Sequence, residues 1–228
     1  MSMARRARVL RLPTAGPQDT TPLPAAIDKG EIDPATIVAI VGKTEGNGCV
    51  NDFTRGYATL ALKLLLAERL GVKLAEIERR VAIVMSGGTE GGLSPHLLVF
   101  CREEVAEVAA NPRLAIGIGL TRAFAPEDIG RAAQIEETAT AVTLAMKDAG
   151  IVSPADVHFV QIKCPLLTKE RIEAAARRGA TVATADTYHS MALSRGASAL
   201  GVAVAQGEIG DVAVTAVCED WSLYSSVA

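Results

Sequence analysis

The chain repeats one short plan twice, and this repetition constrains its fold more than any other feature. An apolar run that ends in a lysine covers residues 37–43 and returns at residues 157–163. A hydroxyl residue followed by arginine, glycine and small residues opens segment 54–60 and again segment 194–200. Internal repetition is the signature of a chain built from similar structural units. We therefore predict a tandem duplication.

The first repeat unit is expected over residues 1–110. Short apolar runs bounded by turn residues are typical of strands, and such runs lie at residues 8–12, 36–41 and 81–85. A helix is predicted from Thr54 to Leu70, ended by Gly71 in a left-handed cap. The leucines at helical spacing that we expect to face the core are Leu60, Leu64 and Leu65.

The second repeat unit is expected over residues 111–228. Its predicted strands cover residues 114–120, 157–162 and 212–217. Its predicted helices cover residues 126–150, 168–178 and 194–205. Strands that alternate with helices indicate an α/β chain in each half.

Composition excludes several classes of function. The 228 residues carry a net charge of -3, and only 4% of them are aromatic. There is neither a basic face nor a set of stacking rings for nucleic acid. No apolar run approaches the roughly 20 residues of a membrane helix. The four cysteines fit neither a zinc spacing nor a disulfide framework, so we expect reduced thiols in a cytoplasmic protein.

Two glycine-rich polar segments, residues 43–55 and 85–96, each follow an apolar run. A buried strand that opens into glycines and polar residues presents backbone amides and side chains to a small ligand. Two ordinary glycine-rich turns are the alternative. The density of Lys, Glu, Asn, Asp, Arg and Ser at these strand ends favours a binding site.

The residue types in the repeats fit acyl transfer. A lysine near a serine acts as a general base when its amine is neutral, and an arginine grips substrate oxygens with parallel hydrogen bonds. The amides at Ser86, Gly87 and Gly88 resemble donors for a carbonyl oxygen. None of the three histidines lies in a triad-like setting.

Segments 42–55 and 84–91, with 161–167 and 194–201 in the second half, closely resemble the cyanuric acid hydrolase and barbiturase family of ring-opening amidohydrolases. The likeness runs through essentially the whole chain. It implies three similar sheet-plus-helix units around a pseudo-threefold axis, each supplying a lysine, an arginine and a serine. It also implies a homo-oligomer that needs neither metal nor cofactor.

By this resemblance the first unit supplies Lys43, Arg55 and Ser86-Gly87 as groups that bind the substrate. The second unit supplies Arg195 for binding and Lys163 as the general base for a nucleophilic serine. The implied reaction opens a cyclic imide such as cyanuric acid. Serine attacks a ring carbonyl, a ring C–N bond breaks, and the acyl-enzyme is hydrolysed to carboxybiuret, which loses carbon dioxide to give biuret.

The chain departs from the family in having two of the three units. The second-unit serine is expected either at Ser226, which matches the spacing from Arg55 to Ser86, or just past Ala228 in the family register, which we prefer. The third unit would then come from a separate chain, or the chain is a fragment. A barbiturase acting on barbituric acid and a catalytically incomplete module that binds a small planar ligand remain alternatives.

Overall fold

The computed structural model describes residues 4–88, 92–107 and 114–228, which form two compact units. The first unit runs from Met1 to Ile116 and the second from Gly117 to Ala228. Each unit has its own cluster of buried apolar residues. The predicted boundary between residues 110 and 111 lies outside the described residues.

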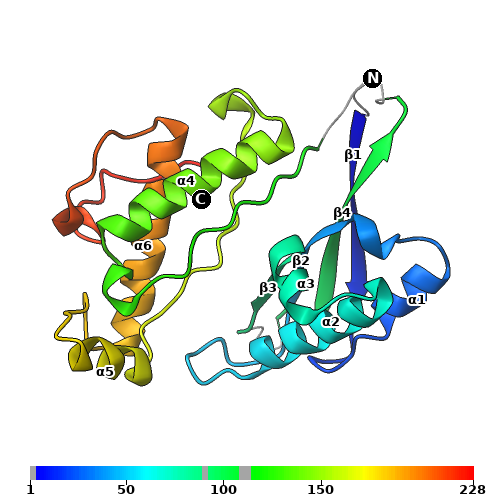
Figure 1. The fold of residues 1–228 in the computed structure, drawn as a ribbon, viewed down its shortest axis with the longest axis horizontal. Helices are drawn as coiled ribbons and strands as arrows, with labels where there is room; N and C mark the ends of the chain where they lie inside the picture. The colour runs from blue at the N-terminus through cyan, green and yellow to red at the C-terminus, as the bar shows by residue number, and fades with distance from the viewer. Residues whose placement is uncertain (1–3, 89–91, 108–113) are drawn as a thin grey trace. The chain divides into compact units, whose positions relative to one another are not determined.

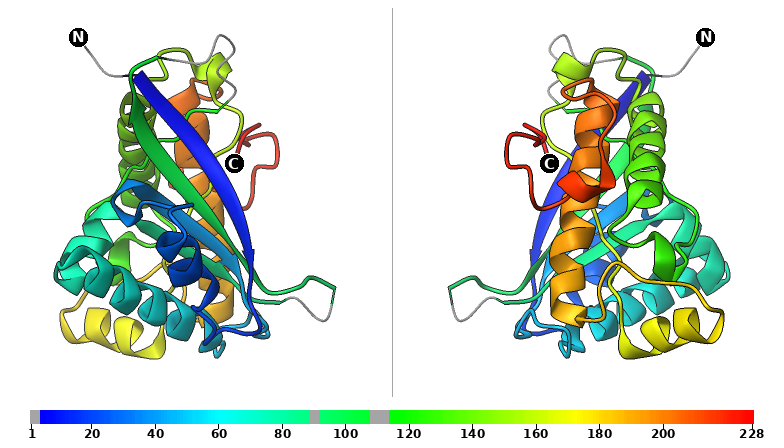
Figure 2. Two further views of the ribbon diagram at one scale, coloured as in Figure 1. Left: turned by 90° about the vertical axis from the view of Figure 1, so that its right-hand side faces the viewer. Right: turned by 90° about the vertical axis from the view of Figure 1, so that its left-hand side faces the viewer.

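The first unit is built on a four-stranded sheet in the order β1-β4-β2-β3 (Figure 1). Its strands are β1 (Ala4–Pro13), β2 (Ile37–Lys43), β3 (Ala82–Ser86) and β4 (His96–Val105). β4 pairs antiparallel with both β1 and β2, and β1 and β4 lie side by side along their length (Figure 2). β2 and β3 are parallel, which sets Lys43 opposite Ser86 where both strands end. The three strands predicted in this half are confirmed, and β4 adds a fourth.

Helices cover one face of this sheet (Figure 1). They are α1 (Pro22–Asp28), α2 (Thr54–Leu70) and α3 (Leu74–Arg80), with a 3-10 turn η1 (Pro34–Thr36) before β2. The predicted helix bounds of α2 are confirmed, including the left-handed Gly71 cap with φ 64°. Fully buried side chains from all three helices pack on the sheet, among them Leu23, Leu66 and Ile77.

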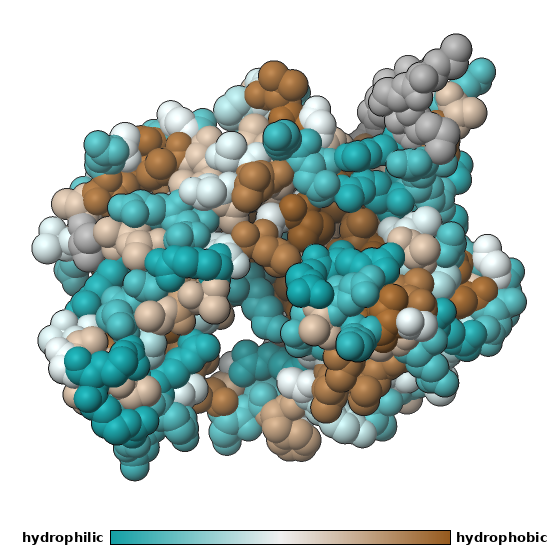
Figure 3. Space-filling view, viewed as in Figure 1, coloured by the Kyte–Doolittle hydropathy of each residue, from teal (hydrophilic) through white to brown (hydrophobic). Residues whose placement is uncertain are grey.

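The core-facing side of α2 differs from the predicted one. Leu62 and Leu66 are buried, whereas Leu60 and Leu64 are half exposed and only Leu65 packs against the core from the predicted set. Apolar side chains consequently show at the surface over α2 (Figure 3). Leucines occur on both sides of this helix, so helical spacing identified two apolar stripes without deciding which one meets the sheet.

The second unit is helical. Its helices are α4 (Ala132–Ala149), α5 (Lys169–Arg177) and α6 (Thr187–Gln206), with short 3-10 turns η2 (Pro126–Asp128), η3 (Pro154–Asp156) and η4 (Val214–Ala216). α4 and α6 pack along one another (Figure 1). Gly201 permits this close approach, because a Cβ there would lie 2.6 Å from the Ile135 carbonyl oxygen. α6 begins before the predicted residue 194, since Asp186 caps it by accepting from the His189 amide.

The strands predicted at residues 114–120, 157–162 and 212–217 do not form in this structure, which describes every residue of that half from 114 onward. The first of these segments packs on a helix instead. A Cβ on Gly117 or Gly119 would lie 1.9 or 2.0 Å from a carbonyl oxygen of α4, and the Ile118 amide donates to Asp148 at 3.0 Å. The third segment is partly a 3-10 turn, η4.

The topology of the first unit explains why these strand predictions are wrong. There, β1 and β2 are joined only through β4, which lies between them. No segment among residues 114–228 takes the corresponding central place. A strand needs a continuous set of hydrogen bonds to a neighbour. Within the described residues, segment 157–162 has one backbone bond of this kind, from the Val160 amide to the Val227 carbonyl oxygen at 2.8 Å, and stays extended without becoming a strand.

Candidate active site

The ends of β2 and β3 bring a lysine and a serine together in the first unit. Lys43 Nζ donates to Ser86 Oγ at 3.1 Å and to the Gly87 carbonyl oxygen at 2.6 Å. Ser86 is exposed and Lys43 is partly buried, so the pair faces accessible space. An amine next to a hydroxyl is the arrangement that lysine-assisted serine chemistry needs. The predicted grouping of Lys43, Ser86 and Gly87 is therefore present.

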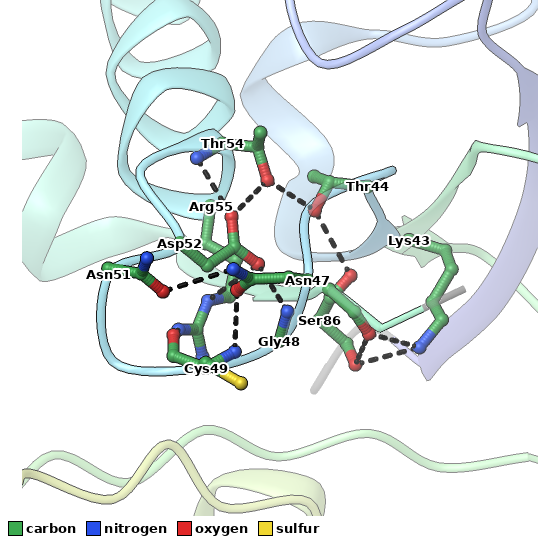
Figure 4. A network of polar contacts seen from close by, with 11 residues as sticks. Lys43, Thr44, Asn47, Gly48, Cys49, Asn51, Asp52, Thr54, Arg55 and Ser86 are labelled. Carbon is green, nitrogen blue, oxygen red and sulfur yellow. Dashed lines mark hydrogen bonds and ion pairs between the residues drawn. The ribbon is translucent and has the colours of Figure 1, made fainter. Parts of the chain in front are cut away.

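The loop after β2 is organised around Asp52 (Figure 4). Asp52 Oδ1 accepts from the amide and hydroxyl of Thr54, and Oδ2 accepts from the Gly48 amide at 2.9 Å. The Thr54 hydroxyl also lies 3.0 Å from the hydroxyl of Thr44, whose amide donates to the Ser86 carbonyl oxygen at 2.8 Å. A continuous set of hydrogen bonds thus links the start of α2 to the end of β3.

The Asp52 carboxylate is buried yet charged. Its side chain has no exposed surface, and burial by itself raises the pKa of a carboxyl group. The hydrogen bonds from Thr54 and Gly48 and the positive charge of Arg55 outweigh that effect, so the pKa of Asp52 lies below its usual value. The network is therefore built around a carboxylate anion.

Arg55 is held at the first turn of α2. Its Nε lies 3.4 Å from Asp52 Oδ2, and its Nη2 donates to the Cys49 carbonyl oxygen at 2.5 Å. The side chain stays 29% exposed, so the guanidinium also reaches accessible space. A guanidinium fixed on one side and open on another is suited to bind a carbonyl or carboxylate of a ligand.

The glycines of the two loops make room for this network. A Cβ on Gly46 would lie 1.9 Å from the Asp52 carboxylate, and one on Gly87 would lie 2.0 Å from it. The Gly88 amide donates to the Gly46 carbonyl oxygen at 2.5 Å. The prediction that the Gly88 amide serves a substrate oxygen is therefore wrong in this structure, because that donor joins the two loops.

The second unit places its predicted residues on different elements. Lys163 is exposed at the end of an extended segment, and Arg195 is exposed on α6, where its Nε donates to the Met191 carbonyl oxygen at 3.2 Å. Cys164 Sγ lies 3.4 Å from Ser198 Oγ, so the residue after the lysine contacts the helix that carries the arginine. Burial raises the pKa of the Cys164 thiol.

A buried glutamine stabilises this part of α6. Gln134 Oε1 accepts from the Gly130 amide at 2.7 Å. Its Nε2 lies 2.9 Å from the hydroxyls of Ser194 and Ser198, which flank Arg195 in sequence. This network was not predicted, because Gln134 lies about 60 residues away from its partners in the chain.

Ser226, the serine expected from repeat spacing, binds a carboxylate. Its hydroxyl and amide both donate to Glu208 Oε1. These hydrogen bonds lower the pKa of Glu208.

The described residues offer no metal site. Among them, no group of three or more His, Cys, Asp or Glu side chains is placed to hold a metal ion. No helix in the described ranges is long and apolar enough to cross a membrane.

Comparison with known proteins decides the family. The model of the amidohydrolase ring-opening protein family (Amido_AtzD_TrzD) matches residues 8–228. The chain belongs to this family. Its α/β class and its organisation in tandem units agree with a solved structure described as "Cyanuric acid hydrolase: evolutionary innovation by structural concatenation". That structure is 53% identical, with a TM-score of 0.94 over 100% of this chain and 63% of its own.

Two curated relatives have the name cyanuric acid amidohydrolase. A cyanuric acid amidohydrolase of Ectopseudomonas oleovorans (strain CECT 5344) is 56% identical over 226 residues, 98% of this chain. One of Bradyrhizobium diazoefficiens is 58% identical over 224 residues, 96% of this chain. The chain spans 62% and 60% of the length of these two relatives. The crystal structure of the cyanuric acid hydrolase from A. caulinodans gives a TM-score of 0.92 at 51% identity, over 99% of this chain and 62% of its own.

The central position of Asp52 was the main site feature that sequence analysis missed. The residue was part of the motif that carried the family resemblance, without a role of its own. A local signal was present, since an aspartate two residues before a threonine can accept from that threonine's amide in an Asx turn. Its contacts with the second glycine loop arise only from the folded sheet.

Proposed function

We propose that this ring-opening amidohydrolase acts on cyanuric acid. The observation that carries the proposal is the placement of Lys43 Nζ 3.1 Å from Ser86 Oγ, in a site where the buried Asp52 carboxylate holds the partly exposed Arg55. It occurs in a chain 51–58% identical to proteins named cyanuric acid amidohydrolase. Lysine, arginine and serine groups are the donors that a ring of alternating carbonyls and N–H groups would meet.

In the proposed reaction a serine Oγ adds to a ring carbonyl while a lysine amine takes its proton. The ring C–N bond then breaks and the leaving nitrogen receives a proton, which gives a ring-opened acyl-enzyme. Water adds to the carbamate carbonyl and releases the serine with carboxybiuret, which loses carbon dioxide to give biuret. This chain's own groups hold the ring oxygens, and their hydrogen bonds stabilise the negative charge that develops on the attacked carbonyl.

Each residue has a proposed role. Lys43, Arg55, Ser86, Gly87 and Arg195 bind the cyclic imide. Lys163 is the general base. The nucleophilic serine is assigned to the position just past Ala228 in the family register, with Ser226 as the alternative inside the chain. The third unit is supplied by a further segment.

The test is biuret release from cyanuric acid by this polypeptide, alone and mixed with the part of the Ectopseudomonas oleovorans relative that the chain does not cover. Activity only in the mixture supports the proposal with the nucleophile beyond Ala228. Activity of the polypeptide alone supports it with Ser226 as nucleophile. Inactivity of both preparations toward cyanuric acid would overturn it, and hydrolysis of barbituric acid instead would identify a barbiturase.

Lysine variants test the assignment of the base. Lys163→Ala should abolish turnover with the fold intact, whereas Lys43→Ala should reduce it less completely. Lys169→Ala is the matched control, because its side chain is 85% exposed and lies on α5, 3.9 Å from Glu173. If Lys163→Ala retained most of the activity of the control, the general base would be another group.

We also propose a cytoplasmic homo-oligomer. The free state of all four cysteines is consistent with a reducing compartment. Light scattering of the purified protein, with the mass compared with the 23.7 kDa of one chain, tests the oligomer. A monomer at micromolar concentration would contradict this part of the proposal.

A further inference from the structure

We propose that Asp52 is the residue that positions Arg55 and locks the two glycine loops of the first unit together. The inference rests on the proposed function, because it takes the Arg55 guanidinium as a substrate-binding group. Asp52 does not reach accessible space, since its side chain has no exposed surface. It therefore acts through its neighbours rather than on the substrate itself.

The contacts of the carboxylate reach three separate parts of the site. Oδ1 accepts from Thr54, at the start of α2. Oδ2 accepts from the Gly48 amide in the middle of the first loop and lies 3.4 Å from Arg55 Nε. One buried anion thus fixes the loop, the helix start and the guanidinium relative to one another (Figure 4).

The second glycine loop packs on the same carboxylate. A Cβ at Gly87 would lie 2.0 Å from Asp52 Oδ2, so the Gly87 backbone lies directly against it. The Gly88 amide joins this loop to Gly46 at 2.5 Å. Since Ser86 directly precedes these glycines, Asp52 also supports the backbone that carries the serine.

An asparagine cannot replace this carboxylate. Within the described residues, the polar groups that contact Asp52 are donors: two amides, a hydroxyl and a guanidinium. An amide side chain has one acceptor oxygen and one NH₂ donor. In Asp52→Asn the side-chain NH₂ would face a donor where the carboxylate had an acceptor oxygen, although the shape of the side chain is kept. The variant therefore removes the negative charge beside Arg55 and leaves one side of the network without its acceptor, with little change in volume.

The first test measures the order of Arg55 without a substrate. In ¹⁵N-labelled protein the Arg55 Nε–H signal should be observed with slow solvent exchange, and Asp52→Asn should accelerate this exchange about tenfold or more. Asp28→Asn is the matched control, since it breaks an exposed ion pair with Arg69 at the other end of α2. Circular dichroism of both variants checks that the fold is kept.

The second test uses turnover of cyanuric acid by the active preparation. Asp52→Asn should lower kcat/KM by about 10- to 100-fold, mainly through a higher KM, because hydrogen bonds to a charged group are among the strong ones. In an Arg55→Ala background the same substitution should lower kcat/KM by a clearly smaller factor, and the loss that remains reports the support that Asp52 gives to the glycine loops. A residue with only a structural role would lower activity by the same factor in both backgrounds.

The outcomes separate this inference from the proposed function. Unchanged Arg55 exchange in Asp52→Asn, or equal losses of kcat/KM in both backgrounds, would overturn the positioning role. If no preparation turns over cyanuric acid, the proposed function fails and the exchange measurement still decides whether Asp52 orders Arg55. Faster exchange together with a loss of kcat/KM that depends on Arg55 would support the inference.

Discussion

Replacing Gly46 with alanine probes the packing of the Asp52 carboxylate directly. A Cβ at Gly46 would lie 1.9 Å from Asp52 Oδ1, and its three nearest heavy atoms all belong to that carboxylate. The carboxylate cannot turn away without leaving its donors on Gly48 and Thr54. Overpacking costs about 1–3 kcal/mol and lost hydrogen bonds to a charged group about 1.5–3 kcal/mol. We expect Gly46→Ala to lower the free energy of unfolding of the first unit by about 3–5 kcal/mol.

The same substitution should be harmless once the carboxylate is removed. Gly46 is not among the glycines with positive φ, so its backbone accepts an L residue. In an Asp52→Ala background Gly46→Ala should therefore stabilise by about 0.4–1 kcal/mol. The coupling free energy between the two positions should be about 3 kcal/mol or more. Gly56→Ala is the matched control: its Cβ would meet nothing within 4 Å, and it should be neutral or slightly stabilising in both backgrounds.

The assay must follow the first unit alone. With two compact units, a single global unfolding curve does not define one free energy. The only tryptophan, Trp221, lies in the second unit and would report on the wrong one. Native-state hydrogen exchange of the β2 and α2 amides measures the first unit directly. A coupling free energy below about 0.5 kcal/mol would refute the packing of Asp52 beneath Gly46.

Three further predictions concern stability. In the exchange assay, Leu62→Ala should lower the free energy of unfolding by about 2–5 kcal/mol and Leu60→Ala by less than about 0.5 kcal/mol, because only Leu62 is buried. Equal losses would contradict the observed orientation of α2. Gln134→Leu should destabilise the second unit by about 2–4 kcal/mol, because it leaves the buried hydroxyl and amide partners of the glutamine unpaired. Hydrogen exchange of the α6 amides measures this loss, and a neutral effect would contradict the network. The stability that the charge of Asp52 contributes should be complete above its unfolded-state pKa of about 3.9 and should be lost as pH falls through its lower folded value. The difference in free energy of unfolding between wild type and Asp52→Ala should therefore begin to narrow below about pH 4 and narrow further as pH falls. A difference that persists unchanged to about pH 2 would show that the charge of Asp52 does not matter.

Much of the first unit could be predicted because its signals are local. α2 begins at Thr54 and ends at a left-handed Gly71, as the sequence indicates. Strand positions followed from short apolar runs, and Lys43 and Ser86 were expected at strand ends. The side of α2 that packs on the sheet was not predictable, since leucines occur on both sides of the helix.

The second unit shows where local signals are insufficient. Its helices were expected, and Thr168 caps α5 by accepting from the Arg171 amide. Its apolar segments read as strands, but a strand is stabilised by hydrogen bonds to neighbours that may lie far away in sequence. Segment 114–120 packs on α4 in this structure, through contacts of Gly117 and Gly119 that no local pattern encodes.

By itself, the sequence determined the family, the duplication and the residue types of the site, because motifs and repeats are written in consecutive residues. Only the tertiary structure decided that Lys43 meets Ser86, since this contact depends on the register of two parallel strands. The same holds for Asp52, whose carboxylate contacts Gly87 across 35 residues of chain. Burial of an anion between two loops is a property of their packing, and packing is settled only when the whole sheet has formed.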